Sequence, residues 1–431
     1  MGDLVRTRKI RMKPTLEGRK IIMVWFKAMF QIYNNVVKDL NDTLQHENKV
    51  STIQLREKYR KLYVNNEAQT KEEDLWMVDV PSAIRDGALR DVLHALKTEL
   101  SKRDKNSKHH FTFHERSWKG GASSYSLRIP ALAISNGTIF PLAKLGQIKY
   151  MLKKKDPFPE INHECKLQRT SFGQFYLCVP MDCKPSPPFN PNDAGEPRSI
   201  ALDPGNREFS SGYDPSGIFV SIARGSVVRL NRLGHFADEL KSTIDLALNA
   251  RDAAKAASPS TSLALPSSEG ILKLRRIRNL TRVFHKTLKK MYDTVDDLHK
   301  KFAHFLVMSY DLVLLPMFRS SLLVLKRNKD GKKRRINNTA VRNMLSWRHG
   351  AFRRFLLGRA ELTPCVVDLV CEAYTSKTCG RCGEINDKLG SKKHFLCPSD
   401  RCGYAADRDA NAARNILIRN ASKYLYDKPH A

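Results

Sequence analysis

Four of the nine cysteines form two close pairs. Cys379 and Cys382 are separated by two residues, Cys397 and Cys402 by four, and fourteen residues lie between the pairs. Two such turns can bring four thiolates to one ion, which is the ligand set of a closed tetrahedral zinc site. We therefore expect one structural Zn²⁺ that folds a small ribbon without a core of its own. Two disulfides or free thiols are the alternatives.

Asp203 closes the apolar segment SIALD, which predicts a short strand that ends in a Pro-Gly turn. Alternation along this strand is expected to put Ala201 and Asp203 on one face and Ile200 and Leu202 on the other. A carboxylate at the exit of a strand can line a site. The simpler interpretation is a turn aspartate before Pro-Gly.

Asp409 opens the segment DANAARNILIRN, which predicts a final helix. Ala412, Ala413 and Ile416 recur at helical spacing, so the helix can lie close to a sheet and carry its first-turn aspartate to the sheet edge. The alternative role is helix capping, for which Asp407 is equally suitable.

Phosphodiester hydrolysis by two Mg²⁺ ions would give such acidic residues a common purpose. The ions lie about 4 Å apart and are held by carboxylate oxygens from separate elements. A strand-end aspartate, a second acid and a helix-borne aspartate near the end of the sequence occur in the order used by RNase H-like nucleases. The sequence therefore predicts a nuclease whose second acid has yet to be identified.

The elements that would position these residues fall into two halves. The first half predicts a basic strand ending at Pro14, a long amphipathic helix, helices at about 51–63 and 81–103, and short strands from about 110 to 183. The Pro-rich segment 184–198 marks a domain boundary. The second half predicts strands after residue 199, helices at about 232–256, 271–310 and 338–360, and strands at DLVLLPMF and VVDLVCE. Strands followed by helices indicate a multidomain α+β or α/β protein.

The charge balance predicts a polyanionic partner. The 431 residues include 75 Lys and Arg against 44 Asp and Glu, a net charge of +31 spread along the sequence. Nucleic acid is the first candidate partner and an anionic membrane surface the second.

The sequence has no run of about 18 apolar residues and its first residues lack a signal peptide's apolar core, so we expect a soluble, intracellular protein. The odd number of cysteines argues against a disulfide framework, and the other five, Cys165, Cys178, Cys183, Cys365 and Cys371, are expected to be buried small hydrophobic residues.

The segment from about Glu372 to Leu417 resembles the zinc ribbon and final nuclease motif of the transposon-encoded TnpB (OrfB) family, which is related to type V CRISPR effectors. The resemblance is carried by TSKTCGRCG, a second pair ending in CGY, and DRDANAARNIL. The segment ALDPGN is similar to the family's first RuvC motif, and RKIRMKPT followed by a long helix resembles its N-terminal part.

One position departs from that family. Its members carry the second catalytic acid as a glutamate that closes an apolar strand, and the corresponding strand here, DLVLLPMF, has Pro316. Asp311 lies at the other end of that strand. Glu372 is the better candidate, and a glutamate just before TSxTC resembles the eukaryotic branch of the family, the Fanzor proteins. Asp368, on the same strand, is expected to be a surface or packing residue.

The resemblance implies a wedge β-barrel at 1–14 and 110–183 that is interrupted by a helical recognition lobe at 15–109. A linker at 184–198 leads to an RNase H-like RuvC nuclease domain at 199–375 and 404–431, with the zinc ribbon inserted at 376–403. It also implies that Asp203, Glu372 and Asp409 hold two catalytic Mg²⁺ ions and that Cys379, Cys382, Cys397 and Cys402 hold one structural Zn²⁺.

The implied activity is RNA-guided cleavage of double-stranded DNA beside a short target-adjacent motif. A guide RNA encoded with the transposon would read the target by base pairing, while protein cations hold the backbone. We expect a monomeric ribonucleoprotein without a membrane partner. The basic segment 326–335 is either a nuclear localisation signal or a nucleic-acid-contacting loop, and a nuclear location is expected. The basic helix at 271–292 is either a solvated face or a phosphate-contacting one.

Two other functions are compatible with the sequence. A protein that binds guide RNA and DNA without cleavage would explain Pro316. A transposase in the strict sense would need an end-binding module and a multimer, and the sequence contains no segment dedicated to either.

Overall fold

The structure is a computed structural model. It describes residues 4–46, 51–65, 72–105, 110–116, 124–135, 137–141, 145, 148–152, 156–188, 197–257, 268–318, 320–325, 331, 336–390 and 392–426. The chain divides into two compact units, residues 1–183 and 184–431.

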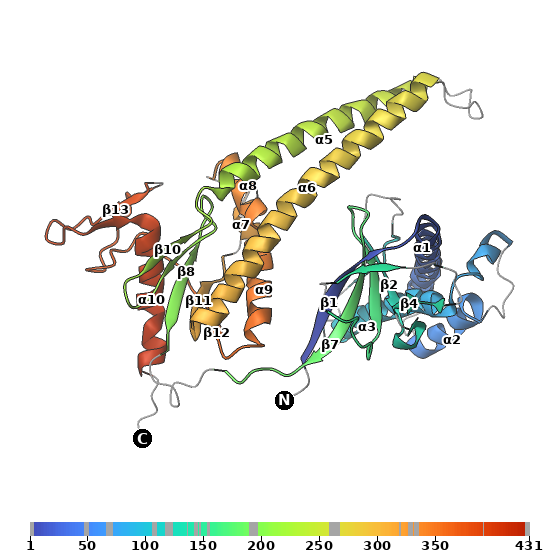
Figure 1. Ribbon diagram of the computed structural model, residues 1–431, viewed down its shortest axis with the longest axis horizontal. Helices are drawn as coiled ribbons and strands as arrows, with labels where there is room; N and C mark the ends of the chain where they lie inside the picture. The colour runs from blue at the N-terminus through green and yellow to red at the C-terminus, as the bar shows by residue number, and fades with distance from the viewer. Residues whose placement is uncertain are drawn as a thin grey trace. The chain divides into compact units, whose positions relative to one another are not determined.

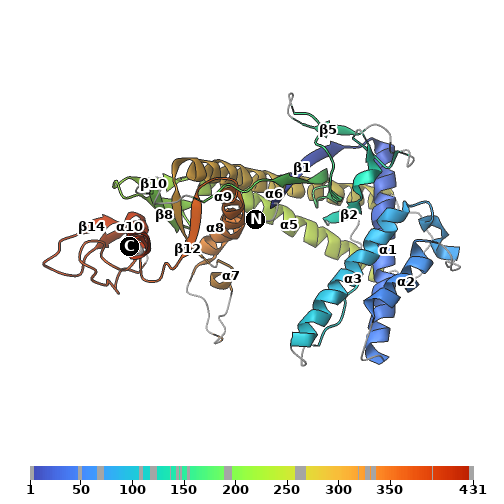
Figure 2. The ribbon, with the colours of Figure 1, turned by 90° about the horizontal axis from the view of Figure 1, so that it is seen from below.

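The first unit combines a sheet with helices (Figures 1 and 2). Its strands are β1 (Leu4–Lys13), β2 (Tyr125–Ile129), β3 (Ile134–Ser135), β4 (Thr138–Ile139), β5 (Lys149–Met151), β6 (Cys165–Arg169) and β7 (Phe175–Cys183). Its helices are α1 (Leu16–His46), α2 (Thr52–Tyr63) and α3 (Ser82–Lys105), with short 3₁₀ turns at Glu72–Met77 and Ala131–Ala133. The strand, long helix and two further helices predicted for this half are confirmed.

One antiparallel sheet organises these strands in the order β2-β6-β7-β1-β5. Helix α1 buries its apolar positions, including Ile22, Phe26 and Leu40, in one core with the sheet and with α3. Among the described strands, β2 and β5 lie at the two edges of the sheet, so the closed barrel stays a prediction.

The second unit contains the sheet that carries the candidate site. Its strands are β8 (Ser199–Pro204), β9 (Ser210–Tyr213), β10 (Phe219–Ile222), β11 (Leu312–Pro316) and β12 (Val366–Val370), in the order β10-β9-β8-β11-β12. Strands β10, β9 and β8 are antiparallel hairpin neighbours, whereas β8, β11 and β12 run parallel. The carboxyl ends of the three parallel strands therefore meet at one edge.

Helices cover both faces of this sheet. They are α5 (Ser226–Ala257), α6 (Ser268–Ser309), α7 (Ser320–Leu323), α8 (Asn338–Trp347), α9 (His349–Ala360) and α10 (Arg408–Tyr426). Ile200 and Leu202 share a core with α6 and α9, and Ala201 shares one with Leu314, Val370 and α10. The predicted alternation along β8 is confirmed. Figure 1 shows α10 on one side of the sheet and α6 and α9 on the other, with α5 and α6 extending together as a long hairpin.

Three predictions about local structure are wrong. The helix expected at 338–360 is two helices, because Arg348 adopts a left-handed conformation with φ of 53°. The strand expected to end at Glu372 ends at Val370, so Glu372 lies in the turn that leads to the ribbon. Cys371 is exposed and Cys178 and Cys183 are partly exposed, whereas Cys165 and Cys365 are buried as expected.

Strand β13 (His394–Leu396) of the ribbon pairs antiparallel with β14 (Ala405–Asp407), which lies just beyond the predicted end of the ribbon and directly before α10. Of the basic segment 326–335, only Gly331 is among the described residues, so its predicted role lies outside them. Within the described part of the chain, no helix is long and apolar enough to span a membrane.

Candidate active site and metal centre

Strand register brings Asp203 to the sheet edge where the parallel strands end. Leu314 of β11 aligns with Ala201 of β8 and with Asp368 of β12, and Pro316 aligns with Val370. Asp203 lies two residues after Ala201 and Pro316 two residues after Leu314, so the same register places Asp203 opposite Pro316 on the neighbouring strand. Glu372 lies two residues after Val370, the last residue of β12. It therefore lies at the same edge of the sheet, although it is not part of the strand.

A cavity of about 430 Å³ lies at this edge and contains all three predicted carboxylates. Asp203 comes from β8, Glu372 from the turn after β12, and Asp409 from the first turn of α10. The remaining lining residues are Pro204, Gly205, Asn206, Arg207, Glu208, Ser211, Phe318, Met344, Thr375, Ser376, Lys392, Lys393 and Arg408. Three elements distant in sequence thus converge on one space.

The pKa of each of the three carboxylates is raised, and burial is the largest cause at all three. Burial, followed by the charges of Asp409 and Glu372, raises the pKa of Asp203 to about 8. Burial also raises the pKa of Glu372, and burial together with Asp407 raises that of Asp409. The Arg408 guanidinium opposes the shifts at Asp203 and Asp409 without removing them. A divalent cation would relieve this repulsion, and carboxylate oxygens are the ligands that Mg²⁺ prefers.

Asp407 and Asp409 have different positions at the start of α10. The Asp407 carboxylate accepts hydrogen bonds from the backbone N–H groups of Asp409 at 2.8 Å and Ala410 at 3.2 Å. It therefore caps the helix. Asp409 lines the cavity and Asp407 does not.

Four cations also line the cavity: Arg207, Lys392, Lys393 and Arg408. Arg408 joins the ribbon to α10, because its backbone N–H donates to Lys393 O at 2.7 Å and its Nη1 to Gly390 O at 3.1 Å. Lys392 and Lys393 are exposed. The ribbon thus presents two lysines beside the carboxylates, a position that the sequence alone did not reveal.

The loop that follows Asp203 is held by the α8–α9 junction. Trp347 Nε1 donates to Asn206 O at 3.1 Å, and His349 Nε2 lies 2.9 Å from Gly205 O. Burial lowers the pKa of His349 to about 4, so at neutral pH the imidazole is uncharged and its Nε2–H donates to that carbonyl. The left-handed Arg348 between the two rings lets both face the same loop.

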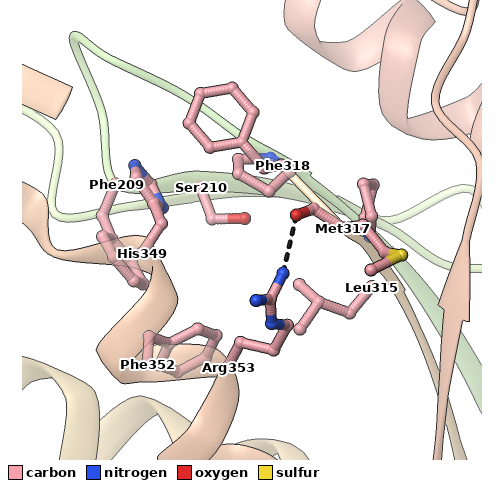
Figure 3. A pocket seen from close by; sticks show the side chains of 10 residues that line it. Phe209, Ser210, Leu315, Met317, Phe318, His349, Phe352 and Arg353 are labelled. Atoms are coloured by element: carbon pink, nitrogen blue, oxygen red, sulfur yellow. Dashed lines mark hydrogen bonds between the residues drawn. The ribbon is translucent and has the colours of Figure 1, made fainter. Parts of the chain in front are cut away.

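The surroundings of Pro316 are apolar. A small cavity of about 10 Å³ beside it is lined by Pro204, Phe209, Ser210, Leu315, Met317, Phe318, His349, Phe352 and Arg353. Figure 3 shows the Phe209 and His349 rings face to face and Arg353 directed at the carbonyl of Met317, to which its Nη1 donates at 2.7 Å. No carboxylate lines this described cavity. At the other end of β11, Asp311 pairs with Arg198 at 2.9 Å.

The four cysteines of the two pairs form one cluster. Their sulfur atoms all lie within 4.8 Å of one another, with Cys379 and Cys402 3.8 Å apart and Cys382 and Cys397 3.5 Å apart. With Zn–S bonds of about 2.3 Å, a regular tetrahedron has S–S edges of about 3.8 Å. The cluster could hold a metal ion, and its geometry and donor set are consistent with zinc.

All seven predicted site residues therefore fall into two clusters, three carboxylates at the sheet edge and four thiols in the ribbon. Sequence reasoning missed Arg207, Glu208, Lys392, Lys393 and Arg408. Arg207 and Glu208 follow directly after DPGN, and Arg408 stands between the two aspartates of DRD, so proximity to the motifs was the available signal. Lys392 and Lys393 carried no local signal.

Comparisons with known proteins identify relatives. Residues 349–416 match the family model for the Cas12f1-like TNB domain. Over 423 residues the chain is 26% identical to A625R of Paramecium bursaria Chlorella virus 1, named as a transposase, and covers 87% of it. It is 25% identical over 430 residues to the TnpB-like protein L79 of Acanthamoeba polyphaga mimivirus and covers 73% of that protein. Both alignments span 96% of this chain.

A shorter match involves a nuclease. Over 92 residues the chain is 33% identical to the CRISPR-associated endodeoxyribonuclease Cas12f1 of Sulfoacidibacillus thermotolerans, an alignment that covers 21% of each chain. Together with the family model and the viral relatives, this match supports membership of the TnpB-like and Cas12f1-like family.

Proposed function

We propose that this chain, as a member of the TnpB-like and Cas12f1-like family, is an RNA-guided DNA endonuclease of the Fanzor type. The observation that carries the proposal is the convergence of Asp203, Glu372 and Asp409 on one cavity. In this assignment Glu372 supplies the second acid that Pro316 cannot. The guide RNA, the short target-adjacent motif and the Mg²⁺-dependent RuvC chemistry are parts of the same proposal.

The arrangement of the second sheet supports this reading. Three antiparallel strands continue into three parallel ones through the shared strand β8, with helices on both faces. The acidic residues lie where the parallel strands end, which is the edge at which open α/β sheets place their sites. We assign this unit to the RNase H-like RuvC type.

In the proposed mechanism Asp203, Glu372 and Asp409 would hold two Mg²⁺ ions, and the chemistry that such ions would supply is activation of water and stabilisation of the charge on the leaving oxygen. The residues of this chain orient the substrate around that centre. Arg207, Lys392 and Lys393 contact phosphates of the strand in the cavity, and Arg408 keeps the ribbon beside α10. Trp347 and His349 hold the loop that follows Asp203. These hydrogen bonds limit the movement of the Asp203 carboxylate.

The target DNA sequence would be recognised mainly by base pairing with the guide RNA, and the protein would hold the nucleic-acid backbone. The net charge of +31 fits that division, because phosphate contacts by Lys and Arg are independent of sequence. The four-cysteine cluster would hold one structural Zn²⁺. We propose a monomeric ribonucleoprotein that acts in the nucleus.

One observation favours a second candidate, a guide-RNA and DNA-binding protein that does not cleave. The position at which the family carries its glutamate is Pro316, and its surroundings are apolar. If Glu372 did not hold a metal ion, two aspartates would remain, and binding without hydrolysis would result.

The deciding experiment uses the protein purified with its copurifying RNA. Sequencing that RNA identifies the guide, and a matching DNA is then incubated with Mg²⁺. We expect cleavage by the unaltered complex and at least a hundredfold loss in Glu372→Ala. Asp368→Asn is the control, since Asp368 lies on β12 and does not line the cavity.

Cleavage by Glu372→Ala at the normal rate would disprove the assignment of the second acid. If the unaltered complex binds its RNA and DNA without cutting, the binding function is correct.

A further inference from the structure

Helix α10 directs two buried asparagines at the segment that leads from Glu372 into the ribbon. Asn411 is 0% exposed and Asn415 is 7% exposed. A buried amide that lacks hydrogen-bond partners is costly, so the partners of these two side chains indicate what they hold in place.

Both side chains bond to the backbone of residues 375–380. Asn415 Nδ2 donates to Thr375 O at 2.8 Å and to Thr378 O at 2.7 Å. Asn411 Nδ2 donates to Thr378 O at 2.8 Å, and its Oδ1 accepts from the N–H of Gly380 at 3.0 Å. Two side chains from one helix thus make four hydrogen bonds to three backbone groups of a segment that is neither helix nor strand.

The connection reaches Glu372 through Thr375, which is also buried. The hydroxyl of Thr375 donates to Glu372 O at 2.9 Å, and its N–H lies 3.3 Å from the same oxygen. Asp409 lies on α10 two residues before Asn411. Although 36 residues lie between Glu372 and Asp409 in the sequence, a short chain of hydrogen bonds joins their backbones.

Gly380 shows how closely the helix approaches this segment. A Cβ atom at Gly380 would lie 2.6 Å from Arg414 Nη1 and 2.9 Å from Asn411 Oδ1, so no larger residue fits without displacing them. Arg414 also donates to the carbonyl of Gly380. Side chains of α10 therefore lie in close contact with the backbone at Gly380.

We propose that Asn411 and Asn415 are positioning residues that fix Glu372 relative to Asp409 and thereby set the Mg²⁺ affinity of the carboxylate cavity. This inference rests on the proposed role of those carboxylates. Mg²⁺ requires near-ideal octahedral geometry, so ligands from separate elements must be held at set distances. Loss of groups that orient metal ligands typically lowers metal affinity by about 10–100-fold.

The experiment compares Asn415→Leu with Asn420→Leu in the RNA-bound protein. Asn420 is a matched control, because it is 4% exposed, lies on the same helix, and donates to Ile416 O of that helix at 2.8 Å. The measurements are the Mg²⁺ concentration for half-maximal cleavage, Mn²⁺ affinity by calorimetry with uncleavable DNA, the thermal midpoint and zinc content.

We expect Asn415→Leu to need about tenfold more Mg²⁺, with cleavage recovered at saturating Mg²⁺, and Asn420→Leu to stay within twofold. Both variants should lose thermal stability. An equal Mg²⁺ shift in both, or none in Asn415→Leu, would overturn the inference.

Arg419→Met provides a second variant should Asn415→Leu fail to fold or lose its zinc. Arg419 is exposed, and its Nη1 donates to Ala373 O at 2.7 Å, directly beside Glu372. A rise in the Mg²⁺ requirement supports the inference, and an unchanged requirement contradicts it. If the unaltered complex does not cleave but Mn²⁺ affinity still falls in Asn415→Leu and holds in Asn420→Leu, the proposed function fails and the positioning role is supported.

Discussion

The Asp407 carboxylate accepts a hydrogen bond from the backbone N–H of Asp409 at 2.8 Å, so the first aspartate caps α10 and the second lines the cavity. The two aspartates of the DRD motif therefore have different roles. The cap orients the helix from which the other carboxylate projects.

This relationship predicts opposite effects of two substitutions. Asp407→Ala should lower stability by about 1 kcal/mol, the usual cost of losing a helix cap, and retain most cleavage. Asp409→Asn should abolish cleavage and leave the thermal midpoint equal or higher, because it removes a repelled carboxylate. Thermal unfolding and a cleavage assay on both variants check this, and full activity in Asp409→Asn would contradict it.

The raised pKa of Asp203 predicts how stability depends on pH. Its pKa rises from 3.8 to about 8 on folding, so the folded protein binds the proton more tightly than the unfolded chain does. Without divalent ions, stability contributed by the protonated form should be lost as pH rises from about 4 to about 8. Mg²⁺ should restore several degrees of thermal midpoint at pH 8, and Asp203→Asn should flatten the pH dependence. An unchanged slope in Asp203→Asn would show that this carboxyl is not its source.

The two rings that hold the Asp203 loop can be separated by substitution. His349→Phe keeps a ring against Phe209 but loses the donor to Gly205 O, and Trp347→Phe loses the donor to Asn206 O. Each change should cost about 1 kcal/mol of stability, because a partly buried carbonyl loses its hydrogen-bond donor. We expect cleavage to fall severalfold in both. Chemical denaturation measures the first effect, and normal stability in both variants would mean that the loop is held by other contacts.

The four-cysteine cluster predicts one bound metal ion per chain. Cys397→Ser should release the zinc, lower the thermal midpoint and abolish cleavage, because the ribbon carries Lys392 and Lys393 to the cavity. Cys371→Ser is the control, since Cys371 is exposed and outside the cluster. Elemental analysis and thermal unfolding provide the measurements, and full zinc content in Cys397→Ser would argue against this ligand set.

The cavity lysines predict a change in the salt dependence of DNA binding. Replacing Lys392 and Lys393 by alanine should weaken DNA binding at all sequences and reduce the slope of log affinity against log salt by about one per lysine that contacts a phosphate. Lys388→Ala is the control, because Lys388 is an exposed ribbon residue outside the cavity. A reduced slope in Lys388→Ala alone would place the contact elsewhere on the ribbon.

The sequence by itself determined the parts of the molecule whose signal is local. Spacing of the cysteines predicted the metal cluster, and alternation in SIALD predicted which face of β8 carries Asp203. Periodicity predicted α1, α2, α3, α5 and α6, because an amphipathic helix repeats its burial pattern every three to four residues.

Only the tertiary structure decided how these parts meet. The capping role of Asp407, the lysines beside the carboxylates and the asparagine contacts from α10 depend on backbone groups far away in the sequence. The break at Arg348 was missed because apolar spacing continues through it, while the left-handed turn faces Trp347 and His349 to a distant loop. Periodicity reports which side of an element is buried, whereas a site is made by the strand register and hydrogen bonds that join separate elements.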